Sequence, residues 1–404
     1  MASAAAAAPT MPLLRLRLLS SLTLIAAFTP PVCPPRPATV ARSRSAMLLS
    51  SEPLEKALDE EEVRSERFGA RPPLVSLLAP AKVNLFLRVV RRRGGDEEYA
   101  GYHELASLFQ TVSLFDTLEF WTEPPDESAP VCSMEVSETS RGRENIPTDG
   151  SNLVMRAMKL FAERTKVEHR LHCRLHKEIP SQAGMGGGSS DAATALHAAN
   201  RLAGFPVTQD ELIKWGGELG SDVSFFLSRG SAYCTGRGEI IDFRDPLPPT
   251  AVYLVKPSAG LSTPRVFKQL GLKPGDTVPG RNPLDLLDDF ESPLGVYEAE
   301  YVNDLETPAF KLLPMLKELR DDLSQLGFQA VMMSGSGTTI FCIGPPFAEV
   351  TDTWQGELKQ KYDVEIFEEL FCRRLDDEKL WYAEQPEGAE LTNIQEPVDI
   401  WRSY

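Results

Sequence analysis

A run of small residues near the middle of the chain has the composition of a phosphate-binding loop. Four glycines occur within the five positions 184–188, and Ser189 and Ser190 follow them directly. Glycine permits positive φ angles and a close approach of the backbone to an anion. Either serine could cap a helix that begins there, and the unbonded N–H groups at a helix N-terminus attract phosphate. The segment is therefore predicted to hold a phosphate without a lysine of its own.

The glycine-rich segment by itself leaves a packing role open beside a binding role. It matches neither the G-x-x-x-x-G-K-[ST] nor the G-x-G-x-x-G pattern, and glycine-rich turns often serve packing alone. Apolar residues alternate over 171–175, which predicts a strand before the loop. Alanine and leucine recur at helical spacing over 192–203, and Gly204 is placed to end that helix. The loop is therefore expected between a strand and a helix.

Two other segments carry side chains suited to chemistry. Apolar residues alternate over 82–89 as in a half-buried strand, so Lys82 and Asn84 are predicted to share one face. Asp222 follows Gly220 and Ser221 in a turn, where an aspartate commonly caps a helix. A carboxylate there could equally accept a proton from a hydroxyl within hydrogen-bond reach.

The remaining elements are predicted from periodicity and capping. We expect an amphipathic helix over 152–164, and a capping box of Thr208 and Glu211 opens a helix that runs to about Leu219. A strand over 251–255, a helix over 310–326 and a small-residue loop between two strands follow. The prolines at 246, 248 and 249 predict a boundary between domains at 73–248 and 249–386, with a tail at 387–404.

Composition excludes some classes of protein. The chain has 404 residues, 42% of them hydrophobic, which is enough for one or two cores, and we expect two domains. A net charge of −16 argues against a nucleic-acid binder, because such proteins usually carry a basic face. The six cysteines include no C-x-x-C and no paired histidine spacing. We therefore expect buried reduced thiols, with neither disulfides nor a metal cluster.

The amino terminus has the composition of an organelle presequence. No acidic residue precedes Glu52, while five arginines occur among Ala, Ser, Leu and Pro. The apolar run 18–28 is about half the length that a membrane-spanning helix needs, so we expect no membrane insertion. A plastid transit peptide and a bipartite signal plus transit segment both fit. Residues 1–72, including an acidic linker from Glu52, are expected to be largely disordered.

Three segments in a fixed order resemble the motifs of the GHMP kinases, named for galactokinase, homoserine kinase, mevalonate kinase and phosphomevalonate kinase. They are Ala-Pro-Ala-Lys-Val-Asn-Leu-Phe-Leu at 79–87, the glycine-rich loop, and Ser-Gly-Ser-Gly at 334–337. The resemblance covers about 74–386. It implies a two-domain α+β fold, with an N-terminal domain like the second domain of ribosomal protein S5 and a ferredoxin-like C-terminal domain.

The chain resembles one branch of this superfamily more closely. The motifs that it shares with this branch are Gly-Tyr-His at 101–103, Leu-Phe-Gln at 108–110 and Gly-Ser-Asp-Val at 220–223. The resemblance implies an ATP-dependent kinase of the plastid stroma that phosphorylates the C2 hydroxyl of 4-diphosphocytidyl-2-C-methyl-D-erythritol, giving the 2-phosphate and ADP in the non-mevalonate pathway to isoprenoids. Met185 stands where the branch usually has leucine, and Asp191 where asparagine is also common. Neither change removes a backbone donor.

The resemblance also implies roles for residues. Asp222 matches the catalytic base and Lys82 the catalytic lysine. Tyr102 and Phe267 match residues that stack on cytosine, and His103 matches one that bonds its edge. The other implied acceptor-binding residues are Asn84, Gly335 and Gly337. The implied ATP-binding residues are Asn152, Lys177, Pro180, Ser181, Gln182, Ala183, Gly184, Met185, Gly186, Gly187, Gly188, Ser189 and Ser190. Mg²⁺ is implied by ATP, and Ser190 and Asp191 are candidate ligands.

Two other interpretations remain at this point. The chain could be a GHMP kinase of the homoserine or mevalonate type, although those acceptors carry no base for Tyr102, His103 and Phe267 to bind. It could also be a metabolite sensor that keeps the fold without turnover, although Lys82 and Asp222 favour an enzyme. A monomer and a homodimer are both compatible with the sequence.

Overall fold

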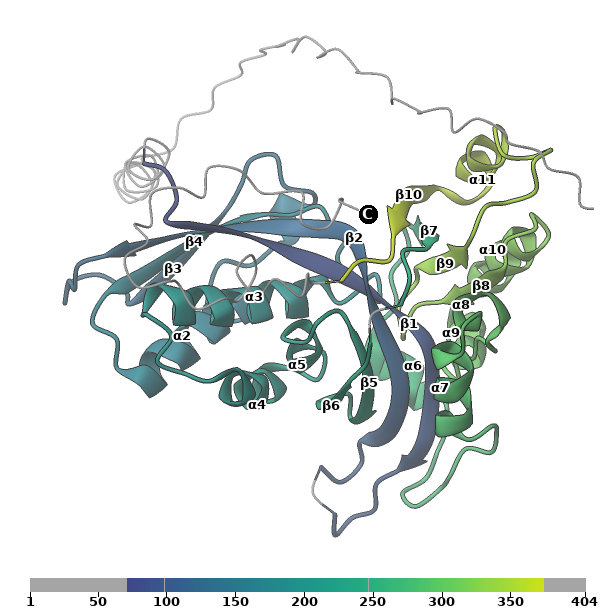
Figure 1. Ribbon diagram of the computed structural model, residues 1–404, viewed down its shortest axis with the longest axis horizontal. Helices are drawn as coiled ribbons and strands as arrows, with labels where there is room; N and C mark the ends of the chain where they lie inside the picture. The colour runs from purple at the N-terminus through teal and green to yellow at the C-terminus, as the bar shows by residue number, and fades with distance from the viewer. Residues whose placement is uncertain (1–70, 98, 246, 374–404) are drawn as a thin grey trace, which may run out of the picture. The chain divides into compact units, whose positions relative to one another are not determined.

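The computed structural model describes residues 71–97, 99–245 and 247–373 (Figure 1). They lie within one compact unit, Phe68–Tyr404, and contain two β-sheets with helices packed on them, which confirms the predicted α+β class. The predicted presequence, apart from Arg71 and Pro72, and the predicted tail lie outside the described residues. Among the described helices, none has the length and hydrophobicity to span a bilayer.

The first sheet is built around β1 and β2, two long antiparallel strands. Its strands are β1 (Val75–Arg92), β2 (His103–Glu123), β3 (Cys132–Val136), β4 (Arg170–His176), β5 (Ser231–Gly236) and β6 (Ile240–Phe243). Their order is β3-β4-β2-β5-β6, with β1 paired to β2. Only the β3–β4 pair in this described sheet is parallel. The glycine-rich loop follows β4, as expected.

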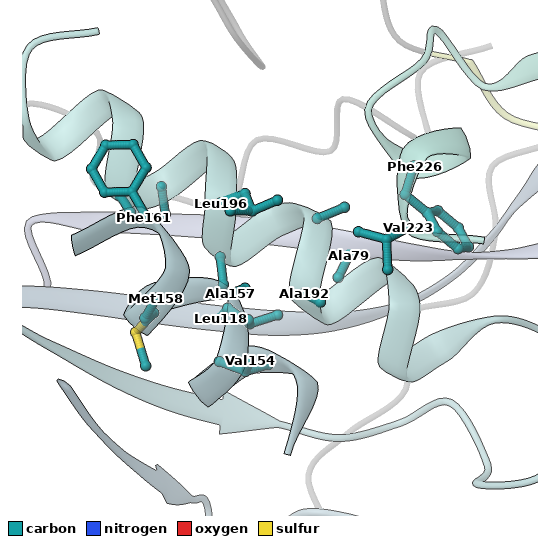
Figure 2. Close-up of a cluster of buried hydrophobic side chains, with 14 of the residues drawn as sticks. Ala79, Leu118, Val154, Ala157, Met158, Phe161, Ala192, Leu196, Val223 and Phe226 are labelled. Carbon is teal, nitrogen blue, oxygen red and sulfur yellow. The ribbon is translucent and has the colours of Figure 1, made fainter. Parts of the chain in front are cut away.

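Helices cover this first sheet and bury its core. The helical segments are η1 (Arg143–Asn145), α2 (Leu153–Thr165), α3 (Gly187–Leu202), α4 (Gln209–Leu219) and α5 (Val223–Phe226). Figure 1 shows α2 and α3 along one face of the sheet. In Figure 2, Phe161 of α2 and Leu196 of α3 lie in one buried cluster with Ala79 of β1 and Leu118 of β2. The capping box predicted for Thr208 and Glu211 is present at the start of α4.

The second sheet is antiparallel and belongs to the C-terminal part of the chain. Its strands are β7 (Ala251–Pro257), β8 (Ala330–Met333), β9 (Ile340–Ile343) and β10 (Val364–Leu370), in the order β10-β7-β9-β8. The helices here are α6 (Thr263–Gln269), α7 (Pro283–Glu291), α8 (Gly295–Glu298), α9 (Glu306–Leu312), α10 (Met315–Ser324) and α11 (Trp354–Tyr362). The predicted small-residue loop at 334–337 joins β8 to β9.

Sequence-based expectations about a helix and a strand are wrong. The segment predicted as one helix over 310–326 forms α9 and α10, because Pro314 precedes α10 and cannot continue a helix. The strand predicted as half-buried is buried on both faces, since nearly every residue of β1 from Val75 to Val89 is inaccessible. Its register against β2 shifts at three places, and such bulges bend a strand. β1 therefore contacts cores on both of its sides.

We expect Phe161→Ala to lower the free energy of unfolding by about 3–5 kcal/mol, because it leaves a cavity in the cluster of Figure 2. Phe243→Ala is the matched control, since Phe243 lies in β6 with 50% of its surface exposed. That control should change stability by no more than about 0.5 kcal/mol. Urea unfolding of both variants measures the difference, and equal losses would contradict the description of this core.

Candidate active site

A cleft of about 1290 Å³ lies between the glycine-rich loop, the paired strands β1 and β2, and α6. It is lined by every residue predicted for the site except Ser190 and Gly337. Segments that are far apart in the sequence therefore contribute to one cavity. The residues that line it divide into a central pair of charges, a glycine-rich end and an aromatic end.

Lys82 is the central cation of the cleft, although only 3% of its surface is exposed. Its Nζ donates a hydrogen bond to Oδ1 of Asn84 at 2.7 Å and lies 3.4 Å from Oδ2 of Asp222. The Phe109 ring centre is 4.6 Å from the same nitrogen, within the range of a cation–π contact. These partners make a buried ammonium tolerable. The prediction that Lys82 and Asn84 share a face is confirmed.

Asp222 is the carboxylate nearest to Lys82 on the cleft wall. It occupies the N-cap position of α5, yet its side chain makes no capping hydrogen bond. The side chain is 32% exposed and lines the cleft. Helix capping therefore explains the position of the residue in the turn and leaves its carboxylate directed to the cavity. A hydroxyl bound there could transfer a proton to it.

Asn84 is held in place by a buried hydroxyl that the sequence analysis did not single out. Its Nδ2 donates to Oγ of Ser107 at 2.9 Å, and the Ser107 hydroxyl donates to the carbonyl of Phe86 at 2.5 Å. Asn84 and Ser107 are 1% and 2% exposed. Ser107 could be found only once the register of β1 against β2 was known, because it comes from the neighbouring strand.

The glycine-rich loop is fixed by contacts that only glycine allows. Gly184 has a φ of 78°, and a Cβ on it would lie 2.3 Å from the Ser334 carbonyl oxygen. Gly186 has a φ of 73°, and its Cβ would lie 2.8 Å from the Phe226 ring and 3.1 Å from Cγ of Lys82. The backbone N–H of Lys82 also donates to the Met185 carbonyl at 2.9 Å. The loop is thus attached directly to the strand that carries the central lysine.

The start of α3 gives the glycine-rich end its anion-binding character. The helix begins at Gly187, and Gly186 is its N-cap in a left-handed conformation, without a side-chain cap. The expectation that Ser189 or Ser190 caps the helix is wrong, because both lie inside the first turn. The initial backbone N–H groups of this 16-residue helix are consequently not bonded by a capping side chain. Such groups, together with the helix dipole, favour phosphate.

Lys177 lies at the same end but is committed to two carboxylates. Its Nζ bonds Asp116 and, at 2.7 Å, Oδ2 of Asp191. Burial alone would lower the pKa of Lys177, but the two carboxylates outweigh it and raise that pKa. Burial, with the charge of Asp116, raises the pKa of Asp191 well above its usual range despite Lys177. Asp116 also accepts the backbone N–H groups of residues 178 and 179, so it holds the segment that enters the loop.

The second glycine-rich loop is positioned by Asn303, another residue that the sequence analysis missed. Asn303 donates through Nδ2 to the carbonyls of Met333 at 2.7 Å and Gly335 at 2.8 Å. Gly335 has a φ of 59°, and a Cβ on it would lie 3.0 Å from Oδ1 of Asn84. Gly337 packs against Gly184 instead of lining the cleft. The second loop therefore closes one side of the cavity around Lys82 and Asn84.

The aromatic end contains the residues predicted for a pyrimidine. The His103 ring lies against Phe267, with centroids 4.9 Å apart. Nε2 of His103 is buried and has no hydrogen-bond partner within the described part of the chain, so a ligand could supply one. Burial, followed by the charge of Arg92, lowers the pKa of His103 and favours the neutral imidazole. Tyr102 is 54% exposed and contacts Tyr99 edge-on.

Asn152 lies at the glycine-rich end as the N-cap of α2. Its Oδ1 accepts from the Val154 N–H at 2.8 Å, and its Nδ2 donates to the Pro147 carbonyl at 2.7 Å. The side chain therefore fixes the helix start and the preceding turn on the cleft wall. The predicted helix over 152–164 is confirmed as α2, with its first residue serving as the cap.

Comparisons with known proteins place the chain in a family. Residues 152–230 match the family model for the GHMP kinases N terminal domain, and residues 287–355 match that for the GHMP kinases C terminal. The chain is 34% identical to a solved 4-(cytidine 5'-diphospho)-2C-methyl-D-erythritol kinase, with a TM-score of 0.57 over 74% of this chain and 99% of that one. Homoserine kinase from Cytophaga hutchinsonii, at 14% identity and a TM-score of 0.53, shares the fold alone.

Two curated relatives are named as 4-diphosphocytidyl-2-C-methyl-D-erythritol kinases. The 4-diphosphocytidyl-2-C-methyl-D-erythritol kinase of Protochlamydia amoebophila is 42% identical over 77% of this chain and 94% of its own length. The chloroplastic one of Arabidopsis thaliana is 43% identical over 67% of this chain and 68% of its own. The chain belongs to the 4-diphosphocytidyl-2-C-methyl-D-erythritol kinases, a family of GHMP kinases.

Proposed function

We propose that the protein transfers the γ-phosphate of ATP to the C2 hydroxyl of 4-diphosphocytidyl-2-C-methyl-D-erythritol, as a step of isoprenoid biosynthesis by the non-mevalonate pathway. The observation that carries this proposal is the ion pair of Lys82 and Asp222, 3.4 Å apart between the glycine-rich and aromatic ends of one cleft. An acceptor held at the aromatic end would present its hydroxyl to this pair, facing a nucleotide held at the other.

The chemistry needs positioning, charge stabilisation and a proton acceptor. The bond from the C2 oxygen to the γ-phosphorus forms while the bond from that phosphorus to the β,γ-bridging oxygen breaks, and ADP leaves. The hydroxyl proton passes to the carboxylate of Asp222. The ammonium of Lys82 orients the attacking oxygen and stabilises the negative charge on the transferred group, since Asn84 and Asp222 hold it in place before reaction.

In this proposal the phosphates of ATP are bound by backbone N–H donors and not by a lysine in the loop. The start of α3 and the loop 180–188 would bind the phosphates through N–H groups, and Gly184 and Gly186 allow the backbone to come close. Asn152 would bound the adenine side of the cleft. Lys177 would act through Asp116 and Asp191, which it already bonds, rather than as an unpaired charge on ATP.

The residues at the phosphate end fit a magnesium ion. Near the start of α3, Oγ of Ser190 and Oδ1 of Asp191 are buried oxygens that have no hydrogen-bond partner among the described residues. Hydroxyl and carboxylate oxygens are ligands that Mg²⁺ accepts, and it usually takes few from protein when it binds with a nucleotide. Asp191, which lines the cleft, would hold it; Ser190 does not line the cleft and is the weaker of the two candidates. The ion would supply neutralisation of charge on the β- and γ-phosphates.

The acceptor half is suited to cytidine. His103 offers a buried Nε2 in need of a partner, and Phe267 offers a ring for stacking, which contributes about 1–3 kcal/mol per base. Tyr102, being exposed at the cleft edge, would cover the other face of the base. Homoserine and mevalonate carry no base, so these residues favour the cytidylyl acceptor over those alternatives.

We also propose that residues 1–72 direct the protein to the plastid stroma. Their composition, rich in arginine and free of acidic residues before Glu52, supports this location. The names of the relatives from Arabidopsis thaliana, Oryza sativa and Solanum lycopersicum describe those proteins as chloroplastic.

Asp222→Asn should lower kcat about 10²- to 10⁴-fold, because the amide cannot accept the hydroxyl proton. Lys82→Met keeps the stem without the charge and should lower kcat about 10²- to 10³-fold. ADP release with ATP, Mg²⁺ and the cytidylyl substrate measures both. The surface pair Lys317 and Asp321 supplies matched controls, Lys317→Met and Asp321→Asn, that should keep full activity.

An unmutated protein without turnover would instead support a metabolite sensor and contradict the kinase proposal. Full activity in Asp222→Asn would remove Asp222 as the base while leaving the kinase assignment intact. Preference for mevalonate or homoserine would contradict the proposed acceptor.

The KM for the cytidylyl acceptor should rise as pH falls through the pKa of His103, which burial places below the usual 6.5. The neutral ring is the form that accepts a bond from the base, so KM should be constant above neutrality. His103→Ala should raise this KM about 10-fold at pH 7.5, for one lost hydrogen bond, and flatten its pH dependence. The KM for ATP is the internal control. An unchanged pH profile in the variant would exclude His103 as the responsible group.

Residues 1–72 fused to a fluorescent protein should enter isolated chloroplasts and be cleaved there, because the part before Glu52 contains arginines and no acidic residue, as is typical of transit segments. Replacing the five arginines before Glu52 by glutamate should block entry. Insertion into microsomes before chloroplast entry would indicate the bipartite form. Exclusion of the unaltered fusion from both would contradict the proposed location.

A further inference from the structure

The Ser107 hydroxyl lies one hydrogen bond behind the residue that contacts Lys82. It is on β2, buried, and placed between Asn84 and the carbonyl of Phe86. The register of β1 against β2 shifts between Asn84 and Phe86, and at this bulge the Phe86 carbonyl accepts the serine proton.

The bonding capacity of the hydroxyl fixes the orientation of the Asn84 amide. A serine hydroxyl has a single proton, and a carbonyl oxygen can only accept. With that proton given to Phe86, the serine oxygen can only accept from Asn84, so the amide NH₂ must face Ser107. The amide oxygen is then the atom that faces Lys82, at 2.7 Å.

We propose that Ser107 is a positioning residue for the reaction, which sets the amide of Asn84 so that its oxygen holds the ammonium of Lys82. This inference rests on the proposed kinase function. Without the hydroxyl, no described group at position 107 requires the NH₂ group of Asn84 to face it. If the amide rotated, its N–H donors would point at the Lys82 ammonium. Lys82 would then lose the partner that fixes one of its three N–H bonds and would turn toward Asp222.

Substitution of Ser107 by Thr and by Val isolates the hydroxyl, because the two side chains have the same shape. Thr keeps the hydroxyl and adds one methyl group, whereas Val carries a second methyl group in place of the hydroxyl. We expect Ser107→Val to lower kcat about 10- to 100-fold relative to Ser107→Thr, because it disturbs the bond between Asn84 and the charged Lys82, and this is the range for a hydrogen bond to a charged group. The KM for ATP should change less than kcat, since the nucleotide half is bound elsewhere. The full chain is assayed for ADP release with ATP, Mg²⁺ and the cytidylyl acceptor, and thermal unfolding is measured in parallel.

A double-mutant cycle separates positioning from a structural effect. In a chain that already carries Asn84→Ala, the difference in kcat between Thr and Val at position 107 should disappear, because Ser107 acts through Asn84. Ser113→Thr and Ser113→Val form the matched control on the same strand, since Ser113 bonds Glu369 and Leu370 away from the cleft. That pair should show equal kcat values.

Equal kcat for Ser107→Thr and Ser107→Val in an active protein would overturn the inference. A difference that persists in the Asn84→Ala background would also overturn it, because the hydroxyl would then act by another route. Failure of the unmutated chain to turn over the acceptor would instead contradict the proposed function. The variants at position 107 therefore test the inference about Ser107, and the unmutated chain tests the proposed function, in the same assay.

Discussion

Two loops meet beside the cleft with no side chain between their backbones. One is the glycine-rich loop, which follows β4 of the first sheet, and the other joins β8 to β9 of the second sheet. A Cβ on Gly337 would lie 2.2 Å from the Gly184 nitrogen, and Ser334 donates to the Gly184 carbonyl at 3.1 Å. Gly335, within the same turn, adjoins Asn84 and Lys82. The glycine-rich loop, the second loop and the central lysine therefore have one relative position, set by atoms that cannot rotate away. A side chain at Gly184 or Gly337 would force the two loops apart.

Two buried lysines illustrate how partners decide what a charge can do. Lys177 is 5% exposed and Lys82 is 3% exposed, so burial does not distinguish them. Lys177 is bonded to two buried carboxylates, which hold its charge within the protein. Lys82 has a neutral amide oxygen and one carboxylate that is itself partly exposed. Its field is consequently less compensated and reaches a group bound in the cleft, which is what a stabilising cation requires.

Local patterns predicted which residues line the cleft better than they predicted which residues hold them in place. Lys82, Asp222 and the glycine-rich loop were found from sequence because each belongs to a short motif with its own spacing. Ser107 and Asn303 were not, since their bonds depend on strand register and on contacts between sheets. The start of α3 was misplaced because a left-handed glycine, rather than a serine, ends the loop. The single helix predicted over 310–326 is two helices, because Pro314 interrupts it and the prediction used the spacing of apolar residues alone.

β1 gives the protein a property that its division into two domains conceals. Successive parts of this strand enter separate cores: Val75, Leu77 and Ala79 in one, then Val83 and Leu85 in a second that includes residues of β7 and β9. Leu87 and Val89 reach a third, with residues of α9 and α10. The C-terminal half is thus completed by a strand from the N-terminal half. If one half were exchanged with that of a relative, β1 would have to pack against a core from another protein. The two halves are therefore not interchangeable modules.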